Sequence, residues 1–401
     1  MKSEEVRNCG KCGLCLMACP VYREVLSESA SPRGKIQLIK HYAEKNLLAS
    51  LNLREIVSRC LMCGNCTANC PSGVHHDSLF MRMRFQMNED FGEGWIKKAM
   101  FHFLSHEDQL RVASRFARLG RNTALDVKLG NIPIKNLPVF NKKPFRDQVS
   151  EVIEPGQEAR GTVLYFTGCA TNYLYEDVGN AVVRVLCRMG YRVEIPRDQV
   201  CCGLPMFFQG AVEKAESNVL KNISLFDRSD ILGIVVDCAT CGSALRRGYA
   251  AVLSELGIDN ERAERVAEKV KDISEFVYEN FAALEPFLRK TGREIRVTYH
   301  SPCHLRNAQA QTEQLLESLP GVDYARAADA DLCCGGGGTF FYDYPDISRS
   351  LVEKKIKNAV STRARFWATG CPGCRVNLTG NLDTGNNLDV LHPVQLVEMS
   401  M

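Results

Sequence analysis

Cysteines are the residues of this chain best suited to chemistry, and most of the nineteen fall into repeated patterns. Two adjacent pairs, Cys201-Cys202 and Cys333-Cys334, are each followed by a glycine. A lone cysteine precedes each pair, and a Cys-x-x-Cys motif follows it at a similar distance. The two sets of five are Cys169, Cys201, Cys202, Cys238 and Cys241, and Cys303, Cys333, Cys334, Cys371 and Cys374. This recurrence predicts an internal duplication with one composite site between its halves.

Two further cysteine runs near the N-terminus read C-x-x-C-x-x-C-x-x-x-C-P. This is the bacterial two-cluster ferredoxin signature, in which the fourth cysteine of each run ligates the other cluster. We therefore expect two cubane [4Fe–4S] clusters. The expected ligands are Cys9, Cys12, Cys15 and Cys70 for the first cluster, and Cys60, Cys63, Cys66 and Cys19 for the second. Zinc usually takes two Cys-x-x-Cys pairs, which this triple spacing does not match.

A thiolate-bound cluster carries negative charge and favours nearby cations. Several basic residues lie close to the two runs and could supply them, although each could equally belong to an ordinary solvated face. They are Arg7, Lys11, Arg23, Arg33, Lys35 and Arg59.

The two sets of five thiols point to a less common metal site. Soft thiolates select iron–sulfur clusters or zinc, and five thiols exceed what a cube needs. Adjacent cysteines cannot both reach separate corners of a cube comfortably, so one of each pair could bridge two irons. Gly203 and Gly335 would then let the backbone lie against inorganic sulfide. Zinc in one of the two copies stays open, because four of five thiols could form a tetrahedral site.

The composition is that of an ordinary globular protein, with 45% hydrophobic and 24% charged residues. A net charge of +3 does not favour a nucleic-acid partner. No apolar run reaches about 18 residues, which predicts no transmembrane segment, and the charged start has no secretory signal. We expect a cytoplasmic protein, unless a partner holds it at a membrane. Its reduced thiols would then serve metal or redox chemistry.

The elements that must position the thiols alternate between β-rich and helical patterns. Each lone cysteine and each Cys-x-x-Cys motif follows a short β-rich run, and ligands of open α/β sheets bind at that edge. The expected strands are 162–166, 191–195, 231–236, 296–300 and 366–370. The fold class is therefore a mixed α+β and α/β multidomain protein, with a helical ferredoxin-like domain followed by two pseudo-symmetric Rossmann-like α/β repeats.

Four domains or segments follow from these patterns. They are a ferredoxin domain at 1–80, a helical segment and linker at 81–160, a first repeat at 161–290 and a second repeat at 291–401. The proline-containing stretch 131–160 is expected to be extended and draped over the next domain. Residues 259–291 are expected to form a helical link between the repeats.

These motifs, together with Ser31-Pro32-Arg33-Gly34, resemble the catalytic-subunit family of heterodisulfide reductases, in which a two-cluster ferredoxin is fused to a double CCG (cysteine-rich) domain. The chain is also similar to iron–sulfur subunits of glycolate oxidase, of lactate-oxidising complexes and of anaerobic glycerol-3-phosphate dehydrogenase. The resemblance implies one or two noncubane [4Fe–4S] clusters, one for each set of five cysteines. In the reductase branch such clusters bind and cleave a disulfide, which makes the adjacent pairs Cys201, Cys202, Cys333 and Cys334 the catalytic candidates.

Two histidines, His300 and His304, flank Cys303. Either could hydrogen-bond a cluster sulfur or supply a proton to a departing thiolate, and ordering of the loop is the alternative role. The glycine run Gly335–Gly338 lacks the G-x-G-x-x-G spacing of a phosphate loop and is expected to leave room for a cluster or a substrate. Cys187 falls outside every motif and is expected to be a free packing residue.

No flavin or nicotinamide fingerprint occurs in the sequence, so hydride chemistry should lie on a partner, such as a flavoprotein or another electron-transfer subunit. The preferred function is an iron–sulfur subunit of a multi-subunit oxidoreductase that carries electrons between this partner and the CCG sites, where a disulfide is reduced or formed. The alternative is a pure conduit of a flavin-dependent 2-hydroxy acid (glycolate or lactate) or glycerol-3-phosphate dehydrogenase complex, which passes electrons to a quinone or carrier. Completeness of both five-cysteine sets favours the first.

Overall fold

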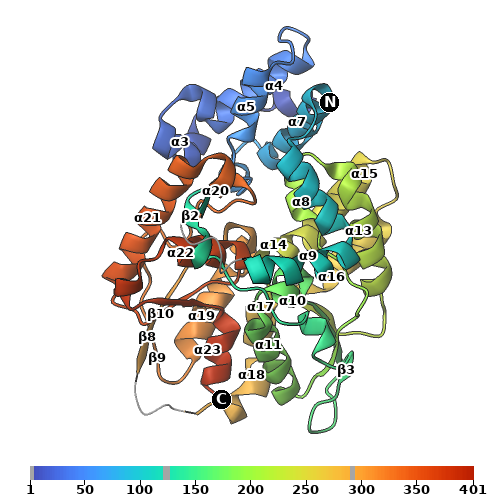
Figure 1. Ribbon diagram of the computed structural model, residues 1–401, viewed down its shortest axis with the longest axis vertical. Helices are drawn as coiled ribbons and strands as arrows, with labels where there is room; N and C mark the ends of the chain where they lie inside the picture. The colour runs from blue at the N-terminus through green and yellow to red at the C-terminus, as the bar shows by residue number, and fades with distance from the viewer. Residues whose placement is uncertain (1–3, 121–126, 290–293) are drawn as a thin grey trace.

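The structure is a computed structural model that describes residues 4–120, 127–289 and 294–401. A small helical domain lies across one end of two α/β units, which stand side by side (Figure 1). The expected boundary between the repeats, at 290–291, falls outside the described residues. None of the helices in the described ranges is long and apolar enough to cross a membrane.

The N-terminal domain is built from short helices separated by cysteine-bearing loops. They are α1 (Glu4–Arg7), α2 (Leu14–Ala18), α3 (Pro20–Val25), α4 (Pro32–Ala43), α5 (Leu51–Ser58) and α6 (Asn65–Ala68). The Cys-Pro junction of the first run starts α3. Cys19 Sγ accepts a hydrogen bond from the backbone N–H of Tyr22 at 3.4 Å. Pro20 occupies the first turn, where a backbone N–H would have no partner within the helix, so its missing N–H costs no hydrogen bond.

The Ser-Pro-Arg-Gly element is a helix start. The Ser31 hydroxyl accepts the N–H of Gly34 at 2.9 Å and so caps α4. Gly34 is required by space, since a Cβ there would lie 2.1 Å from the carbonyl oxygen of Glu28. Arg33 pairs with the Glu28 carboxylate at 2.8 Å. The start of helix α4 therefore explains the residues of this motif without reference to a cluster.

A long helical segment connects the N-terminal domain to the α/β units. It comprises α7 (His76–Phe91), α8 (Trp95–Ser105) and α9 (Glu107–Gly120). The next stretch contains a small hairpin of β1 (Lys128–Leu129) and β2 (Ile132–Pro133), followed by β3 (Val152–Ile153).

The first α/β unit has a five-stranded sheet of order β3-β5-β4-β6-β7. All pairs among β4 to β7 are parallel, and only β3 is antiparallel. The strands are β4 (Thr162–Phe166), β5 (Arg192–Glu194), β6 (Gly233–Val236) and β7 (Val270–Asp272). Its helices are α10 (Gly168–Tyr173), α11 (Glu176–Arg188), α12 (Leu204–Phe208), α13 (Val212–Phe226), α14 (Ala239–Ser243), α15 (Tyr249–Glu255), α16 (Glu261–Lys269), α17 (Ile273–Glu279) and α18 (Phe281–Leu284).

The second unit has a four-stranded parallel sheet of order β9-β8-β10-β11. If the four parallel strands of each sheet are numbered by their place in the chain, their order across the sheet is second, first, third, fourth in both units. The duplicated sequence therefore has a duplicated topology. The strands are β8 (Ile295–Tyr299), β9 (Val322–Tyr324), β10 (Phe366–Ala368) and β11 (Asp389–Leu391). Its helices are α19 (Gln309–Ser318), α20 (Phe340–Asp343), α21 (Pro345–Ser361), α22 (Pro372–Asn381) and α23 (Pro393–Met399), with the 3-10 turn η7 (Cys303–Ala308) before α19.

The five expected strands are present, but the sequence did not predict the last parallel strand of either sheet, β7 and β11, or the strand β9. The prediction that 259–291 is purely helical is wrong, because β7 lies between α16 and α17. The sequence did not reveal β7, because a strand of three residues between two helical patterns is too short to show an alternation of apolar and polar residues. β9 and β11, each three residues long, escaped prediction for the same reason.

The stretch 131–160 is extended as predicted, but it touches both units. Strand β3 adds to the edge of the first sheet beside β5. Asn131 instead reaches the second unit, where its side chain lies within hydrogen-bonding distance of Ser348 and Asn377. Asn136 donates to the carbonyl oxygen of Gly380 at 2.9 Å. The linker therefore ties the two units together.

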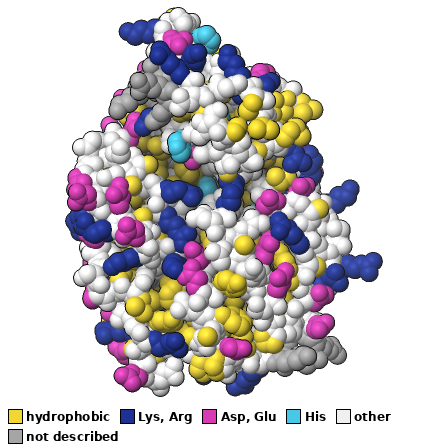
Figure 2. All heavy atoms as spheres, turned by 180° about the vertical axis from the view of Figure 1, so that it is seen from behind, with side chains coloured by type: hydrophobic (Ala, Val, Ile, Leu, Met, Phe, Trp, Pro, Cys, Tyr) yellow, Lys and Arg dark blue, Asp and Glu magenta, His cyan; other side chains and the backbone are white. Residues whose placement is uncertain are grey.

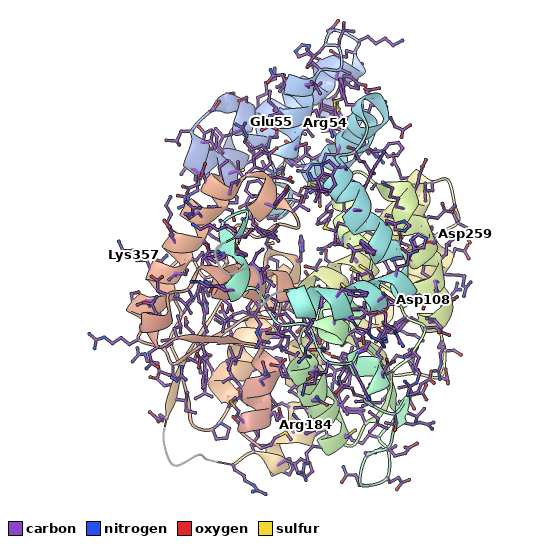
Figure 3. All side chains as sticks on the ribbon, viewed as in Figure 1. Arg54, Glu55, Asp108, Arg184, Asp259 and Lys357 are labelled. Atoms are coloured by element: carbon purple, nitrogen blue, oxygen red, sulfur yellow. The ribbon has the colours of Figure 1, made fainter. Side chains whose placement is uncertain are left out.

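Helices form the interface between the two units. α11 packs on α23 and α17 on α19, and one hydrophobic cluster contains buried residues of both sheets, such as Val163 and Val297. At its lower edge Arg184, labelled in Figure 3, pairs with Glu398. Because each unit buries a face against the other, the carboxyl ends of the two sheets are held in a fixed relation.

Arg84 fastens the N-terminal domain to the first unit. This buried guanidinium donates to the carbonyl oxygens of Ser58 and Cys60, both at 2.8 Å, and to that of Phe208 at 2.6 Å. Since a buried cation is tolerated only when its donors are satisfied, these carbonyls and Arg84 depend on each other.

We predict that Arg84→Met lowers the free energy of unfolding by roughly 2–4 kcal/mol, because several buried carbonyls lose a charged donor. Urea denaturation of the anaerobic protein measures this. Arg115→Met is the matched control, since Arg115 is an exposed arginine on α9. Equal stability of the two variants would contradict the anchoring role of Arg84.

Candidate functional site

The four thiols assigned to the second cubane lie around one cavity. Cys19 comes from the first run and Cys60, Cys63 and Cys66 from the second, and all four line this cavity together with Lys35. Burial raises the pKa of Cys66, and the neighbouring Cys60 and Cys19 raise it further. The structure therefore groups Cys19 of the first run with three thiols of the second; that these four hold one cluster stays a prediction.

The thiols of the first run form a second group nearer the surface. Burial raises the pKa of Cys15 to about 11, with Cys9 and Cys12 close enough to contribute. Cys70 is half-buried at the end of the second run. The N-terminal loop reaches this region, because an ideal Cβ on Gly10 would lie 3.7 Å from Ser72 Oγ.

The first set of five thiols is gathered at the carboxyl end of the first sheet. Cys169 follows β4, Cys238 follows β6, and the adjacent pair lies in the loop after β5. Neighbouring thiols contact one another in the order Cys169, Cys201, Cys202, Cys241 and Cys238. Hydrogen bonds from Cys201 and Cys241 lower the pKa of Cys202 to about 5, despite its burial.

The second set repeats this arrangement at the carboxyl end of the second sheet. Its thiols contact in the order Cys303, Cys333, Cys334, Cys374 and Cys371. Hydrogen bonds from Cys333 and Cys374 hold the pKa of Cys334 well below its ordinary value. The second cysteine of each adjacent pair is thus the thiol that its neighbours favour as a thiolate.

The two sets meet at the junction of the two α/β units. A hydrogen bond from Cys238 is the main cause of the lowered pKa of Cys371. The backbone N–H of Ala239 donates to the carbonyl oxygen of Gly370 at 2.8 Å, and Thr240 Oγ1 lies 3.4 Å from Cys371 Sγ. All ten thiols therefore form one continuous group that spans both units.

Comparison with known proteins agrees with this geometry. Residues 163–246 and 297–379 match the cysteine-rich domain CCG, and residues 5–74 match the 4Fe-4S dicluster domain. The chain belongs to the family of iron–sulfur proteins that join a dicluster domain to two CCG domains. As such it is an iron–sulfur electron-transfer subunit of the oxidoreductase type, and the expected resemblance is confirmed.

Three relatives show the kinds of protein to which the chain is similar. The chain is 28% identical to the glycolate oxidase iron-sulfur subunit of Escherichia coli, over 99% of this chain and 94% of that protein. It is 30% identical to the lactate utilization protein of Shouchella clausii, over 59% of this chain and 98% of that protein. It is 25% identical to a dihydromethanophenazine:CoB–CoM heterodisulfide reductase subunit of Methanosarcina acetivorans, over 95% of this chain and 90% of that protein.

The donor chemistry of the dicluster and CCG groups fits iron–sulfur clusters. Each group consists of thiols, the soft ligands that such clusters require. The space around Cys19, Cys60, Cys63 and Cys66 is a real cavity lined mainly by these thiols and by apolar side chains. In the CCG groups five thiols are buried or half-buried together in each unit.

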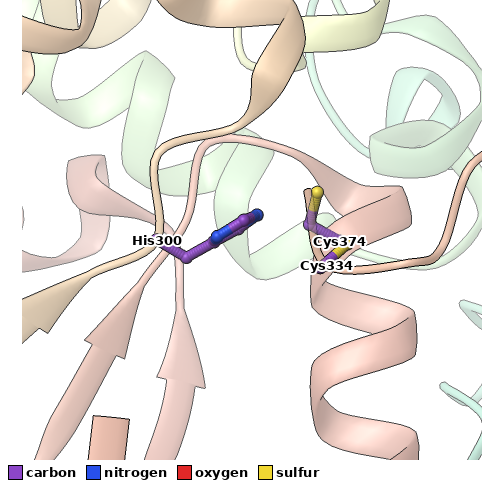
Figure 4. A group of neighbouring side chains, drawn as sticks. All are labelled: His300, Cys334 and Cys374. Atoms are coloured by element: carbon purple, nitrogen blue, oxygen red, sulfur yellow. The ribbon is translucent and has the colours of Figure 1, made fainter. Parts of the chain in front are cut away.

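His300 is the histidine placed at the second CCG group. It follows β8 and its ring points toward Cys334 and Cys374 (Figure 4). One donor atom from each of these three residues lies within 4.8 Å of the others. The ring is fully buried, neither nitrogen makes a well-formed hydrogen bond to a described residue, and burial holds the pKa of His300 well below its usual range. A neutral imidazole of this kind can act as a ligand or as a hydrogen-bond partner of a metal-bound sulfur.

His304 has a different role. Its Nε2 lies 3.2 Å from the carbonyl oxygen of Met62, in the cysteine loop of the dicluster domain. Its ring packs against Phe208 at an angle of 59°, with the ring centroids 5.4 Å apart. His304 therefore contributes to the contact between the second CCG unit and the dicluster domain. Its expected roles, at a cluster sulfur or in ordering the Cys303 loop, stay predictions.

Buried cations accompany the thiols. Lys35, one of the six candidates from the sequence, is 1% exposed and donates to the carbonyl oxygen of Arg59 at 2.5 Å beside Cys60 and Cys19. Lys355 was missed. It donates to the carbonyl oxygens of Asp329 and Ala330, and burial lowers its pKa to about 8 although three thiols of the second set lie near it. The sequence offered one sign of this buried cation, a lysine at a core-facing position of α21.

Glycines shape the thiol loops in ways that spacing alone did not show. An ideal Cβ on Gly168, which was not singled out from the sequence, would lie 2.9 Å from Cys241 Sγ, so only glycine leaves room for that thiol. Gly203 and Gly335 have φ of 79° and 84°. A Cβ on Gly203 would press on Phe207 of α12, and one on Gly335 would press on Ser348 of α21. These contacts explain why both positions require glycine. The expected approach of their backbone to inorganic sulfide stays a prediction.

The glycine run 335–338 makes room for protein as well as for the thiols. Gly336 faces Cys334, whose Sγ would be 3.5 Å from an added Cβ, but Gly337 faces the dicluster domain. A Cβ on Gly337 would lie 2.6 Å from Leu61 Cδ2 and 3.2 Å from Leu61 Cα. Close docking of the Leu61 loop on the second CCG unit therefore depends on Gly337.

We predict that Gly337→Ala loosens this docking. Amide hydrogen exchange in the loop 59–64 should become at least about tenfold faster, which corresponds to about 1.4 kcal/mol in the local opening equilibrium. Gly385→Ala is the control, because a Cβ there meets nothing within 4 Å. Exchange at the wild-type rate in Gly337→Ala would show that the loop does not need this contact.

Proposed function

We propose that this protein carries electrons between a partner protein and the CCG thiol groups, where a disulfide is reduced or formed. The dicluster thiols would hold two cubane [4Fe–4S] clusters, with the ligand sets expected from the two runs. Each set of five CCG thiols would hold a noncubane cluster between two Rossmann-like, pseudo-symmetric repeats. Such clusters, when bound, supply one-electron chemistry to a sulfur substrate.

One observation carries this proposal: the thiol groups are contiguous. Cys63 of the dicluster domain lies near Cys333 and Cys303, both of which, after burial, raise its pKa. From Cys303 the second CCG set continues without a break to Cys371, and from there through Cys238 to the first set. The order is dicluster domain, second CCG unit, first CCG unit.

The surrounding residues support transfer in a dry interior. Eight of the ten CCG thiols are buried, and Cys169 and Cys303 are half-buried. Water is thereby kept from most of the site, while Lys355 and His300 stand beside the second set. The two half-buried thiols are equivalent in the two repeats, so they are the positions at which a substrate or a solvent molecule can approach.

The conduit function is the second candidate. It is favoured by similarity over nearly the whole chain to glycolate oxidase iron-sulfur subunits, whose names place them beside an oxidase. In that case a flavoprotein partner would hand over electrons from a 2-hydroxy acid, and the CCG groups would relay them without binding a thiol.

Metal content tests the cofactor part of the proposal. Anaerobically purified protein should contain about 16 iron atoms per chain if all four sites hold four-iron clusters. About eight iron atoms together with zinc would mean that the CCG groups hold zinc, for which His300, Cys334 and Cys374 offer a suitable donor set.

Thiol addition separates the two functions. We expect the oxidised protein to develop a new paramagnetic resonance signal when a thiol is added. The double variant Cys202→Ala/Cys334→Ala, which alters both sets, should abolish this signal while the dicluster spectrum persists. Cys187→Ala is the matched control, because Cys187 lies on α11 outside both sets. A wild-type protein that stays silent with every thiol tested would favour the conduit.

A further inference from the structure

A cleft between all three parts of the molecule has the features of a ligand site. It has a volume of about 560 Å³, within the range of roughly 300–1,000 Å³ typical of small-molecule sites. Cys63 lies in its wall on the dicluster side and Cys303 in its wall on the second CCG unit. The cleft therefore opens beside the half-buried end of the second thiol set.

One wall of this cleft is apolar. The first CCG unit contributes Leu204, Phe207 and Phe208, and α7 contributes Met81. Apolar side chains at this position would cover the hydrocarbon part of a ligand. Figure 2, which views the molecule from the side opposite to Figure 1, shows hydrophobic side chains together with basic and histidine side chains in the hollow below the N-terminal domain.

Two basic side chains also line the cleft. Arg247 and Arg306 are exposed side chains in the lining, and both act on the pKa of His304 between them. Arg306 donates to Asn65 and to the carbonyl oxygen of Gly64, and Arg247 donates to Ser243 Oγ at 3.0 Å. Neither arginine has a carboxylate partner among the described ion pairs, so both retain donors for an anion.

The backbone around Arg247 is also unusual. Residues Ala244–Gly248 form a π-helical turn between α14 and α15, and such turns occur frequently at functional sites. Asp77, the acidic residue of the lining, accepts a hydrogen bond from Thr67 Oγ1 at 3.0 Å. It is thus engaged within the dicluster domain, while the arginines face the open space.

We propose that this cleft binds a small organic anion with an apolar portion, whose charged group is held by Arg247 and Arg306 beside Cys303. The shared chemistry is an anionic head and a hydrocarbon body, and a carboxylate or a phosphate ester would meet it. The idea that this ligand is the redox substrate rests on the proposed function. The proposal that the ligand binds in the cleft does not depend on that function.

Anaerobic titration calorimetry of the full, cluster-containing chain tests this proposal. The probes are hexanoate and hexyl phosphate, with hexylamine as the cation of matched length and inorganic phosphate as the anion without a hydrocarbon part. We expect saturable binding of at least one hexyl anion, no binding of hexylamine, and weaker binding of inorganic phosphate. Binding of only one hexyl anion supports the proposal and identifies the head group.

Arg247→Gln should weaken hexyl-anion binding by at least about tenfold, since a charge-assisted hydrogen-bond donor is lost. Arg115 is an exposed arginine on α9 and does not line the cleft. Arg115→Gln should therefore bind the hexyl anions as tightly as the wild type does. The proposal is overturned if no hexyl anion binds the wild type, if hexylamine binds equally well, or if Arg247→Gln binds unchanged. Because binding requires no electron transfer, these outcomes are independent of the thiol test of the proposed function.

Discussion

The contact between Cys238 and Cys371 is the point on which the arrangement of the site depends. Each cysteine follows the third parallel strand of its own sheet, β6 or β10, at the carboxyl edge where ligands of such sheets bind. Neither repeat alone could surround ten thiols. The helical interface of α11, α17, α19 and α23 turns the two edges toward each other, and the linker with Asn131 and Asn136 holds them from outside. A shift at this interface would separate the two thiol sets.

Packing so many thiols in a dry interior has an electrostatic cost that the protein offsets locally. Burial disfavours thiolates, and burial is a principal cause of the raised pKa values of Cys63 and Cys66. The structure places Lys35 and Arg84 near the second dicluster group and Lys355 near the second CCG set. All three cations donate hydrogen bonds to backbone carbonyls, and none of them forms an ion pair with a carboxylate among the described residues.

The dicluster domain is placed by a few close contacts. Gly337 admits the Leu61 loop, His304 contacts the carbonyl of Met62, and Arg306 reaches Asn65. All three are loop contacts of the second CCG unit, which explains why the dicluster thiols approach Cys303 and Cys333 and not the first set. The same contacts leave open the cleft that Arg247 and Arg306 line, so docking of the domain and formation of that cleft have one cause.

The sequence by itself determined the thiol groups and the duplication, because ligand spacing is local and metal chemistry allows few interpretations of it. It also indicated the strands that precede Cys169, Cys238, Cys303 and Cys371, whose apolar runs are distinct. It did not show β7, β9 or β11, which are too short to have a period. It predicted room for a cluster or a substrate along the glycine run, and it did not show that Gly337 faces Leu61.

Only the tertiary structure decided which groups adjoin. Cys63 lies beside the second CCG set, and Lys355 is a buried cation near it. His300 turns toward Cys334, while His304 turns toward Met62. All of these placements depend on contacts between segments that are far apart in the chain. Such contacts are set by how the helices of one repeat pack on those of the other, and the spacing of cysteines along a chain carries no information about that packing.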